Sequence, residues 1–489
     1  MSIVTHKMFI NGEWLESATG NTIEVVNPSN EQLVGYAPQA SREEAANALR
    51  SSEAAQKDWA KLPAQKRAEL VAALADELEA DAERYAEMIT QEQGKLLSDA
   101  RGEVAGSVGF LRYAAESARR IEGEIVTSEN QDEQIWIQRV PFGVTVGLLA
   151  WNYPLALAAR KLGNALVTGN TMVVMPPADT PLTVLEFSKL IAKVGFPKGV
   201  VNIVSGLGGE VGDELVRNPI TKLVTLTGSS EVGSILYRSA SENITALNLE
   251  LGGKAPFIVL DDANIDEVVE IAVNSGFGNC GQICTSNERM YIHKAIYAEF
   301  MDKFIAKVKQ LKIGDPMLAS TNVGPKVNAR EVEKLVEMIS KAKAEGATIA
   351  CGGGKPSGEE FANGYWFEPT VVTDVNNQMD IMKQEVFGPV VAAMPIDSLE
   401  QALQYANDID LGLSGYVYTN DMRKIMQVVN ELEVGEIYVN RPNGELLNGF
   451  HTGFKRSGIG GEDGKYGLEG YLQKKTIYLN YLVIFLTSF

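Results

Sequence analysis

A thiol and a carboxylate lie in two short glycine-containing segments of this sequence. Cys284 is in residues 279–285 (NCGQICT), and Glu250 opens residues 250–254 (ELGGK). A cysteine thiolate is a nucleophile, and a carboxylate can act as a general base. A lone cysteine is more often a small buried apolar side chain. A cysteine in a turn of small and polar residues instead favours covalent catalysis.

Two glycine-rich turns have the composition of an anion site. Residues 227–233 (TGSSEVG) follow an apolar run and open a helix, whose first N–H groups would favour a pyrophosphate. Residues 205–212 (SGLGGEVG) form a similar turn upstream. The first pattern is G-x-x-x-x-G and not G-x-G-x-x-G, so a plain helix start remains the alternative.

Asn152 and Glu385 are two further polar side chains in turns. Asn152 follows an apolar run and precedes a helical segment, where its amide could donate a hydrogen bond to a developing oxyanion. A capping role is the alternative. Glu385 opens residues 385–389 (EVFGP), and in isolation it would be read as a solvated loop charge.

Short apolar runs alternate with helical segments along most of the chain. The runs at 144–151 (VTVGLLAW), 171–177 (TMVVMPP) and 200–204 (VVNIV) predict a parallel sheet with crossover helices. A second series of this kind begins after Gly253. Residues 41–91, rich in Ala and Glu, predict two long surface helices.

Composition excludes several classes of protein. A length of 489 residues indicates two or three domains. A net charge of −19 disfavours nucleic acid and anionic membranes as partners, and there is no run of about eighteen apolar residues to span a bilayer. Three cysteines cannot build a disulfide framework and favour the cytoplasm. His6, His293 and His451 are widely spaced without a metal-binding pattern, so we expect no metal ion.

Together the motifs at 150–154 (AWNYP), 250–254, 279–285 and 385–389 resemble the aldehyde dehydrogenase superfamily, and the resemblance covers essentially the whole chain. It is closest to the lactaldehyde, glycolaldehyde and glyceraldehyde dehydrogenases. The resemblance implies oxidation of an aldehyde to a carboxylic acid with NAD or NADP, through a thiohemiacetal and a thioester on the cysteine.

The resemblance also implies an α/β fold with three parts. A Rossmann-type cofactor domain would comprise residues 1–122 and 140–250, and an α/β catalytic domain residues 251–445. A small β oligomerisation arm would comprise residues 123–139 and 465–489. Since the family assembles through this arm, we expect a homotetramer or a homodimer. The apolar tail 482–489 would then pack against a partner subunit, with packing onto its own subunit as the alternative.

Specific roles follow from the resemblance. Cys284 would be the nucleophile, Asn152 and the backbone N–H of Cys284 would bind the oxyanion, and Glu250 would activate water for hydrolysis. Lys161 corresponds to a helix lysine near the active site. The residues implied to contact the cofactor are Leu149, Trp151, Met175, Ala178, Gly208, Gly212, Gly228, Ser229, Leu251, Glu385 and Phe387.

Residues 175–178 depart from the family pattern. The family usually has Lys-Pro-x-Glu here, where the lysine holds the adenosine ribose and the glutamate repels a 2′-phosphate. Met175 and Ala178 can do neither. We therefore expect activity with both NAD and NADP.

The substrate is indicated by four residues. Arg160 stands where succinate semialdehyde dehydrogenases use an arginine for an anionic substrate, and a helix-surface ion pair is its alternative role. Arg441, Asn443 and His451 lie in the loop that usually shapes the entrance. They favour a short polar aldehyde such as lactaldehyde, glycolaldehyde or glyceraldehyde. An anionic semialdehyde (succinate semialdehyde or sulfolactaldehyde type) and a catalytically weak structural homologue remain open.

Overall fold

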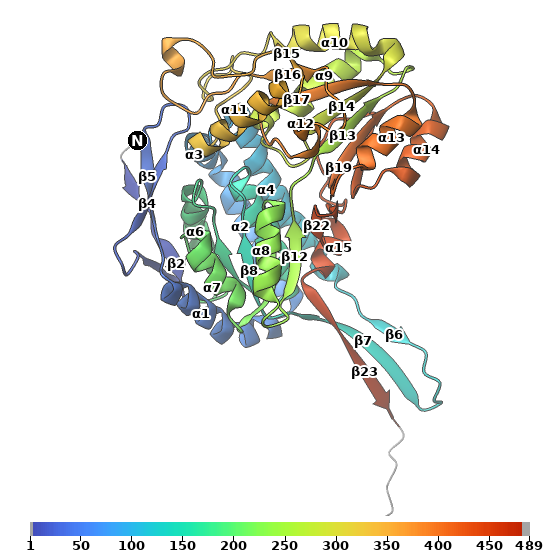
Figure 1. Ribbon diagram of the computed structural model, residues 1–489. Coiled ribbons are helices and arrows are strands. Elements are labelled where there is room, and N and C mark those ends of the chain that lie inside the picture. The colour runs from blue at the N-terminus through green and yellow to red at the C-terminus, as the bar shows by residue number, and fades with distance from the viewer. Residues whose placement is uncertain (1–2, 482–489) are drawn as a thin grey trace, which may run out of the picture.

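The computed structural model describes residues 3–481, which form two α/β units and a projecting β arm (Figure 1). This is the α/β architecture that the sequence predicts. The unit drawn from blue to green carries the first half of the chain, and the unit drawn from lime to orange carries most of the second half.

The first unit is built on an eight-stranded sheet with the order β22-β12-β11-β8-β9-β10-β2-β3. Neighbouring strands from β12 to β10 run parallel. β8 (Val144–Leu148) and β9 (Thr171–Met175) are buried along their whole length, as strands covered on both faces must be. The other strands are β2 (Met8–Ile10), β3 (Glu13–Leu15), β10 (Val201–Ile203), β11 (Thr221–Thr227), β12 (Ala246–Glu250) and β22 (Gly458–Ile459). The crossover helices are α5 (Pro154–Thr168), α6 (Leu182–Val194), α7 (Asp213–Arg217) and α8 (Ser230–Ala240).

Residues 41–91 lie in three helices, so the prediction of two was wrong. α1 (Arg42–Lys61) ends before Pro63, because a residue that precedes proline is driven out of the helical region. Asp81 then separates α2 (Ala64–Ala80) from α3 (Ala82–Gln93). α4 (Leu97–Ser117) follows and packs against α2, α3 and α5.

The second unit is a seven-stranded sheet with the order β15-β16-β17-β14-β13-β19-β20. Only β15 runs antiparallel to its neighbour. The strands are β13 (Ala255–Val259), β14 (Asn287–His293), β15 (Thr348–Cys351), β16 (Thr370–Thr373), β17 (Val390–Ile396), β19 (Ser414–Tyr418) and β20 (Glu436–Val439). The helices are α9 (Ile265–Phe277), α10 (Lys294–Val308), α11 (Ala329–Ala344), α12 (Asp380–Lys383), α13 (Leu399–Asn407) and α14 (Met422–Glu431).

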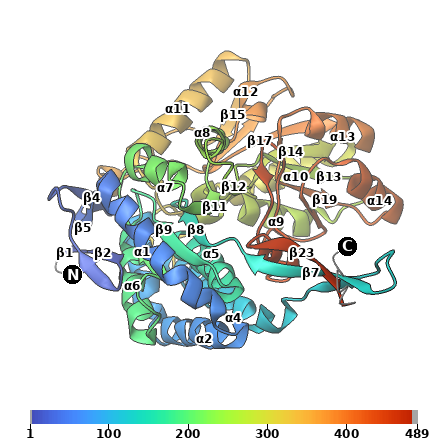
Figure 2. The same cartoon turned by 90° about the horizontal axis from the view of Figure 1, so that it is seen from below.

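Three strands make the arm that projects from the two units (Figures 1 and 2). β23 (Leu472–Asn480) pairs antiparallel with β7 (Glu133–Pro141) along its full length, and β6 (Glu124–Val126) covers the other edge of β7. The prediction for the tail 482–489 lies outside the described residues.

Smaller elements complete the fold. A separate sheet joins β1 (Val4–Thr5), β5 (Leu33–Pro38) and β4 (Thr22–Val26), and β18 (Leu411–Gly412) pairs with β21 (Phe454–Lys455). α15 (Gly464–Glu469) precedes the arm. Among residues 3–481, no helix has both the length and the apolar character needed to cross a bilayer.

The predicted domain boundary at 250/251 falls between the two large sheets, because β12 ends at Glu250 and β13 begins at Ala255. β22 comes from a segment that the predicted ranges leave unassigned, yet it extends the first sheet beside β12. The division into a cofactor domain and a catalytic domain stays a prediction.

A buried ion pair ties the C-terminal segment to the first unit. Lys161, on α5, contacts the carboxylate of Glu462 and donates a hydrogen bond to Thr225 Oγ1 at 2.9 Å. Both charged side chains are almost completely shielded from solvent, with exposed fractions of 0% and 1%. Removal of one partner from such a pair leaves an uncompensated buried charge.

We expect Lys161→Met to lower the free energy of unfolding by about 3 kcal/mol, because Glu462 loses its nearer cation and keeps only Arg160, at 3.8 Å. Lys198→Met is the matched control, since Lys198 and Glu13 are 3.9 Å apart and mostly exposed. The control should change stability by about 0–1 kcal/mol. Urea unfolding followed by circular dichroism measures both, and equal losses would show that the buried pair does not support the fold.

Candidate active site

Cys284 is presented by a strained turn between α9 and β14. Asn279, Cys280 and Gly281 have φ values of 47°, 57° and 68°, three consecutive residues in the left-handed region. A Cβ at position 281 would lie 2.1 Å from the carbonyl oxygen of Gly388, so only glycine allows this approach. The turn therefore packs against the loop that carries Glu385 and Phe387.

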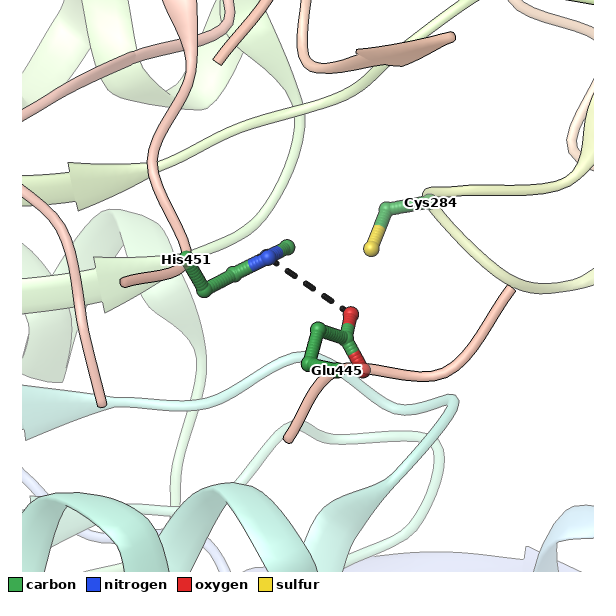
Figure 3. A group of neighbouring side chains, drawn as sticks. All are labelled: Cys284, Glu445 and His451. Atoms are coloured by element: carbon green, nitrogen blue, oxygen red, sulfur yellow. Dashed lines mark ion pairs between the residues drawn. The ribbon is translucent and has the colours of Figure 1, made fainter. Parts of the chain in front are cut away.

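Cys284 faces an imidazole and a carboxylate (Figure 3). One donor atom each from Cys284, His451 and Glu445 lie within 4.8 Å of one another. Burial raises the pKa of the Cys284 thiol, and its hydrogen bond with His451 acts in the opposite direction. His451 therefore favours the thiolate.

His451 is surrounded by carboxylates. Its Nε2 is 3.5 Å from Glu250 Oε2, and its Nδ1 is 3.1 Å from Glu436 Oε2 and 3.5 Å from Glu445 Oε1. Burial alone would lower the pKa of His451, but Glu250, Cys284 and Glu436 together hold it well above its ordinary value. These neighbours favour the protonated form of the imidazole.

Glu250 ends β12 with its carboxylate inside the same pocket. The side chain is 3% exposed, and neither oxygen has a hydrogen-bond partner among the described residues. Burial raises the pKa of Glu250 to about 8, against the opposing effect of His451. A carboxyl with this pKa exchanges a proton readily near neutral pH.

Asn152 lies in the turn between β8 and α5. Its Nδ2 donates a hydrogen bond to the carbonyl oxygen of Gln282 at 3.0 Å, which fixes the amide and leaves its second N–H available. Lys95 Nζ donates to the Asn152 carbonyl oxygen at 2.7 Å and pairs with Glu103 Oε2 at 2.6 Å. The other oxygen of Glu103 accepts from the N–H of Leu155 at 2.9 Å, so the turn is held on both sides.

Arg160 and Lys161 are engaged in buried ion pairs. Arg160 Nη2 contacts Asp463 Oδ2 at 2.6 Å, its Nε is 3.8 Å from Glu462 Oε2, and its guanidinium lies over the ring of Phe110. The alternative role considered for Arg160 was an ion pair on the helix surface. Arg160 does form an ion pair, but the pair is buried. Glu462 also exchanges backbone hydrogen bonds with His451 at 2.8 and 2.9 Å. Arg160 and Lys161 therefore anchor the segment that carries His451.

The groove beside Cys284 contains several residues predicted to bind a cofactor. Its cavity, of about 150 Å³, is lined by Ala150, Trp151, Asn152, Thr227, Gly228, Ser229, Glu250, Leu251, Gly252, Cys284, Glu331, Lys334, Glu385, Phe387 and His451. The rings of Trp151 and Phe387 meet edge to face with centroids 5.2 Å apart. Glu385 Oε1 accepts the N–H of Gly253 at 2.9 Å, and a Cβ at position 252 would lie 2.3 Å from Glu385 Oε2.

The predicted cofactor residues of the first unit follow or end its parallel strands at their carboxyl ends. Leu149 follows β8, Met175 ends β9, and Gly228 follows β11. Met175 is buried, with its Sδ 3.6 Å from the position that a Cβ on Gly212 would take. Ala178 is half-buried, and an added Cβ at Gly208 would meet open space. Carboxyl ends of parallel strands are where such sheets bind ligands.

Arg441 and Asn443 lie outside this cavity, in the loop between β20 and β21. Arg441 donates to the carbonyl oxygens of Pro442 at 3.2 Å and Gly444 at 2.7 Å and lies near the ring of Tyr438. Asn443 is half-buried. Of the loop residues predicted to contact substrate, only His451 lines the cavity.

Sequence reasoning missed two carboxylates of the site, Glu436 and Glu445. Glu436 opens a strand and Glu445 lies in an irregular loop, so no motif marks either one. Lys95 and Glu103 were missed for the same reason. The sequence offered one signal for Glu103, since a charged side chain stands there at an apolar position of the helix pattern.

Comparison with known proteins gives a consistent result. The model of the aldehyde dehydrogenase family matches residues 14–477. A 3,6-anhydro-alpha-L-galactose dehydrogenase of Vibrio sp. (strain EJY3) is 44% identical, over 97% of this chain and 99% of its own length. Lactaldehyde dehydrogenase of Escherichia coli K12 is 40% identical, over 97% and 99%. A solved structure of 3,6-anhydro-L-galactose dehydrogenase with NADP bound has a TM-score of 0.96 and 47% identity, and the match covers 97% of this chain and 100% of that one.

Proposed function

The chain belongs to the aldehyde dehydrogenase family and is an NAD(P)-dependent aldehyde dehydrogenase, and we propose that its substrate is a neutral hydroxylated aldehyde. The observation that carries this proposal is the charge around the thiol. Glu250, Glu436 and Glu445 lie within 3.5 Å of the ring nitrogens of His451. The carboxylates accept hydrogen bonds from hydroxyl groups and repel an anionic substrate.

The state of Arg160 supports the same substrate class. Arg160 is not among the residues that line the cavity, and its Nη2 is already paired with Asp463 at 2.6 Å. Relatives named for 3,6-anhydrogalactose, lactaldehyde and D-glyceraldehyde act on aldehydes that carry oxygen substituents. A glutarate-semialdehyde dehydrogenase of Pseudomonas aeruginosa is also similar, at 37% identity. Its name refers to an anionic aldehyde, the substrate class that this proposal disfavours.

In the proposed mechanism, the Cys284 thiolate attacks the carbonyl carbon of the aldehyde. The oxyanion is stabilised by the free N–H of the Asn152 amide and by the backbone N–H of Cys284. Lys95 positions the Asn152 turn through its hydrogen bond at 2.7 Å. Bound NAD(P) supplies the hydride acceptor.

Several features fit the cofactor. Ser229 caps the N-terminus of α8, which suits a pyrophosphate. Glu385 is placed to accept hydrogen bonds from ribose hydroxyls, and Phe387 and Trp151 offer an apolar wall for the nicotinamide. Met175 and Ala178 offer neither a cation for the ribose nor a carboxylate against a 2′-phosphate, so we propose that both NAD and NADP are used.

Glu250 is proposed to activate the water that hydrolyses the thioester. Its unpartnered oxygens and its pKa of about 8 suit a general base. The product carboxylate then leaves past like charges, which favours its release.

Exposed apolar side chains on the arm support self-association. Ile125 is 74% exposed and Tyr478 70% exposed, on β6 and β23, the two outer strands of the arm. We propose that this arm pairs with a second copy of the chain, to give a homodimer or homotetramer.

We expect Glu250→Gln to form the thioester but hydrolyse it slowly. Stopped-flow absorbance of reduced cofactor should show a burst of about one equivalent per active site, followed by slow turnover. Cys284→Ala is the control and should give neither burst nor turnover. A wild-type steady rate without a burst in Glu250→Gln would assign the water to another base.

We expect the KM for NAD(P) to fall as pH rises through neutrality. Burial and the neighbouring Glu288 raise the pKa of Glu385 to about 7, against the N–H of Gly253. The ionised carboxylate is the stronger acceptor for ribose hydroxyls, so KM should fall about tenfold between about pH 6 and about pH 8. Glu385→Gln should have a high KM at every pH, and an unchanged pH slope in this variant would identify a different titrating group.

Substrate preference tests the main proposal. We expect kcat/KM for lactaldehyde, glyceraldehyde and 3,6-anhydro-L-galactose to exceed that for glutarate semialdehyde by at least about tenfold, the ratio that 1.4 kcal/mol gives. Asp463→Asn removes the partner of Arg160 Nη2 and should narrow this ratio, whereas Asp397→Asn, at an exposed surface ion pair with Lys294, should leave it unchanged. A preference for the semialdehyde in the wild type would contradict the proposal.

A further inference from the structure

Three chemically different donors converge beside the active-site cavity, two of them from residues that line it. A thiol from Cys284, an imidazole nitrogen from His451 and a carboxylate oxygen from Glu445 lie within 4.8 Å of one another. Figure 3 shows the sulfur and the carboxylate directed toward the same side of the imidazole. A thiolate, an imidazole and a carboxylate are the three ligand types that Zn²⁺ takes in proteins.

The surroundings of these donors include polar atoms without hydrogen bonds. His451 is 3% exposed, and its Nδ1 lies 3.1 Å from Glu436 Oε2. Both oxygens of Glu250, also 3% exposed, lack partners among the described residues, and one of them is 3.5 Å from His451 Nε2. Unpartnered buried polar atoms are rare in folded proteins, and an ion is one of the groups that can satisfy them.

The charge around His451 favours a cation. Glu436 and Glu445 place two carboxylates within 3.5 Å of a ring that carries at most one positive charge, and Glu250, with a pKa of about 8, adds a third when it is ionised. The nearby cation of Arg160 is neutralised by Asp463. A divalent ion would remove this excess of negative charge.

We propose that Cys284, His451 and Glu445 form a binding site for a borderline-soft divalent cation of the Zn²⁺ class, which inactivates the enzyme reversibly. Binding releases the thiol proton and the imidazole proton to solvent and changes no oxidation state. The sulfur lone pair that would attack the aldehyde is then donated to the metal. Mg²⁺ and Ca²⁺ do not bind here, because they prefer oxygen ligands.

The donor spacing permits this geometry after a small adjustment. Bonds of about 2.0–2.3 Å arranged tetrahedrally place neighbouring donors about 3.5 Å apart. The observed limit of 4.8 Å therefore requires roughly 1 Å of contraction. Rotation of the Cys284 and Glu445 side chains supplies it, and Glu250 or water completes the fourth position.

Zinc binding is measured first, without cofactor or substrate. Metal-free enzyme is titrated with ZnCl₂ by calorimetry, and we expect one ion per chain. Cys284→Ser, His451→Asn and Glu445→Gln should each weaken zinc binding by at least roughly 10- to 100-fold. Loss of a residue that only hydrogen-bonds to a metal ligand already weakens binding by this factor. Cys351→Ser, which alters a half-buried cysteine outside the cavity, is the matched control and should bind as the wild type does. Unchanged affinity in both His451→Asn and Glu445→Gln would overturn the site.

Alkylation provides a second readout that does not depend on activity. Zinc should protect Cys284 from iodoacetamide, as read by peptide mass spectrometry, while Cys351 labels at an unchanged rate. MgCl₂ should give no protection, and protection by Mg²⁺ equal to that by Zn²⁺ would overturn the assignment.

The inhibition rests on the proposed role of Cys284 as nucleophile, and the two parts can fail separately. We expect zinc to block turnover and EDTA to restore it. Zinc that binds through all three residues without blocking turnover would support the site and reject Cys284 as nucleophile. Inhibition that persists in His451→Asn and Glu445→Gln with undiminished potency would overturn the three-ligand site while leaving the nucleophile in place.

Discussion

The active site depends on three lysine–glutamate ion pairs that are removed from solvent. Each pair fixes a different backbone segment. Lys95–Glu103 holds the Asn152 turn, and Lys161–Glu462 holds the segment of His451. In the third pair, Lys254–Glu288, the carboxylate accepts hydrogen bonds from the N–H groups of Val386 and Phe387 at 2.7 and 2.8 Å. Ion pairs of this kind add little net stability, but they allow one arrangement of the chain, since breaking either partner is costly.

This constraint explains how loops can form a rigid site. Cys284, Asn152 and Glu385 all lie outside regular strands and helices, where backbone is usually more mobile. The anchored carbonyl and N–H groups restrict the loops of Asn152 and Glu385. The excess negative charge lies around His451 and Glu250, beside Cys284, and not at the three ion pairs that anchor the backbone.

Much of the fold and the family could be predicted from the sequence, because both depend on local patterns. Alternating apolar runs and helices indicate parallel sheets, and Cys284, Glu250 and Glu385 each stand in a short motif. The segments of Cys284 and Glu385 meet because they precede β14 and β17, which are neighbouring parallel strands of the second sheet, and Glu250 lies at the carboxyl end of β12 in the first sheet. The partners of Arg160 and Lys161 could not be predicted in this way. Lys161 and Glu462 are 301 positions apart, and nothing in the neighbourhood of either residue specifies the other.

The contribution of β22 to the first sheet has a consequence for synthesis of the chain. β22 pairs with β12, and shortly after it Glu462 supplies the counter-charge for Lys161. At about 5–20 residues per second, a ribosome needs on the order of 15–60 s to travel from codon 161 to codon 462. During that interval Arg160 and Lys161 lack the counter-charges of Asp463 and Glu462, and burying either cation unpaired would be costly. We therefore expect the first unit to complete its packing around α5 only after codon 463 has been translated.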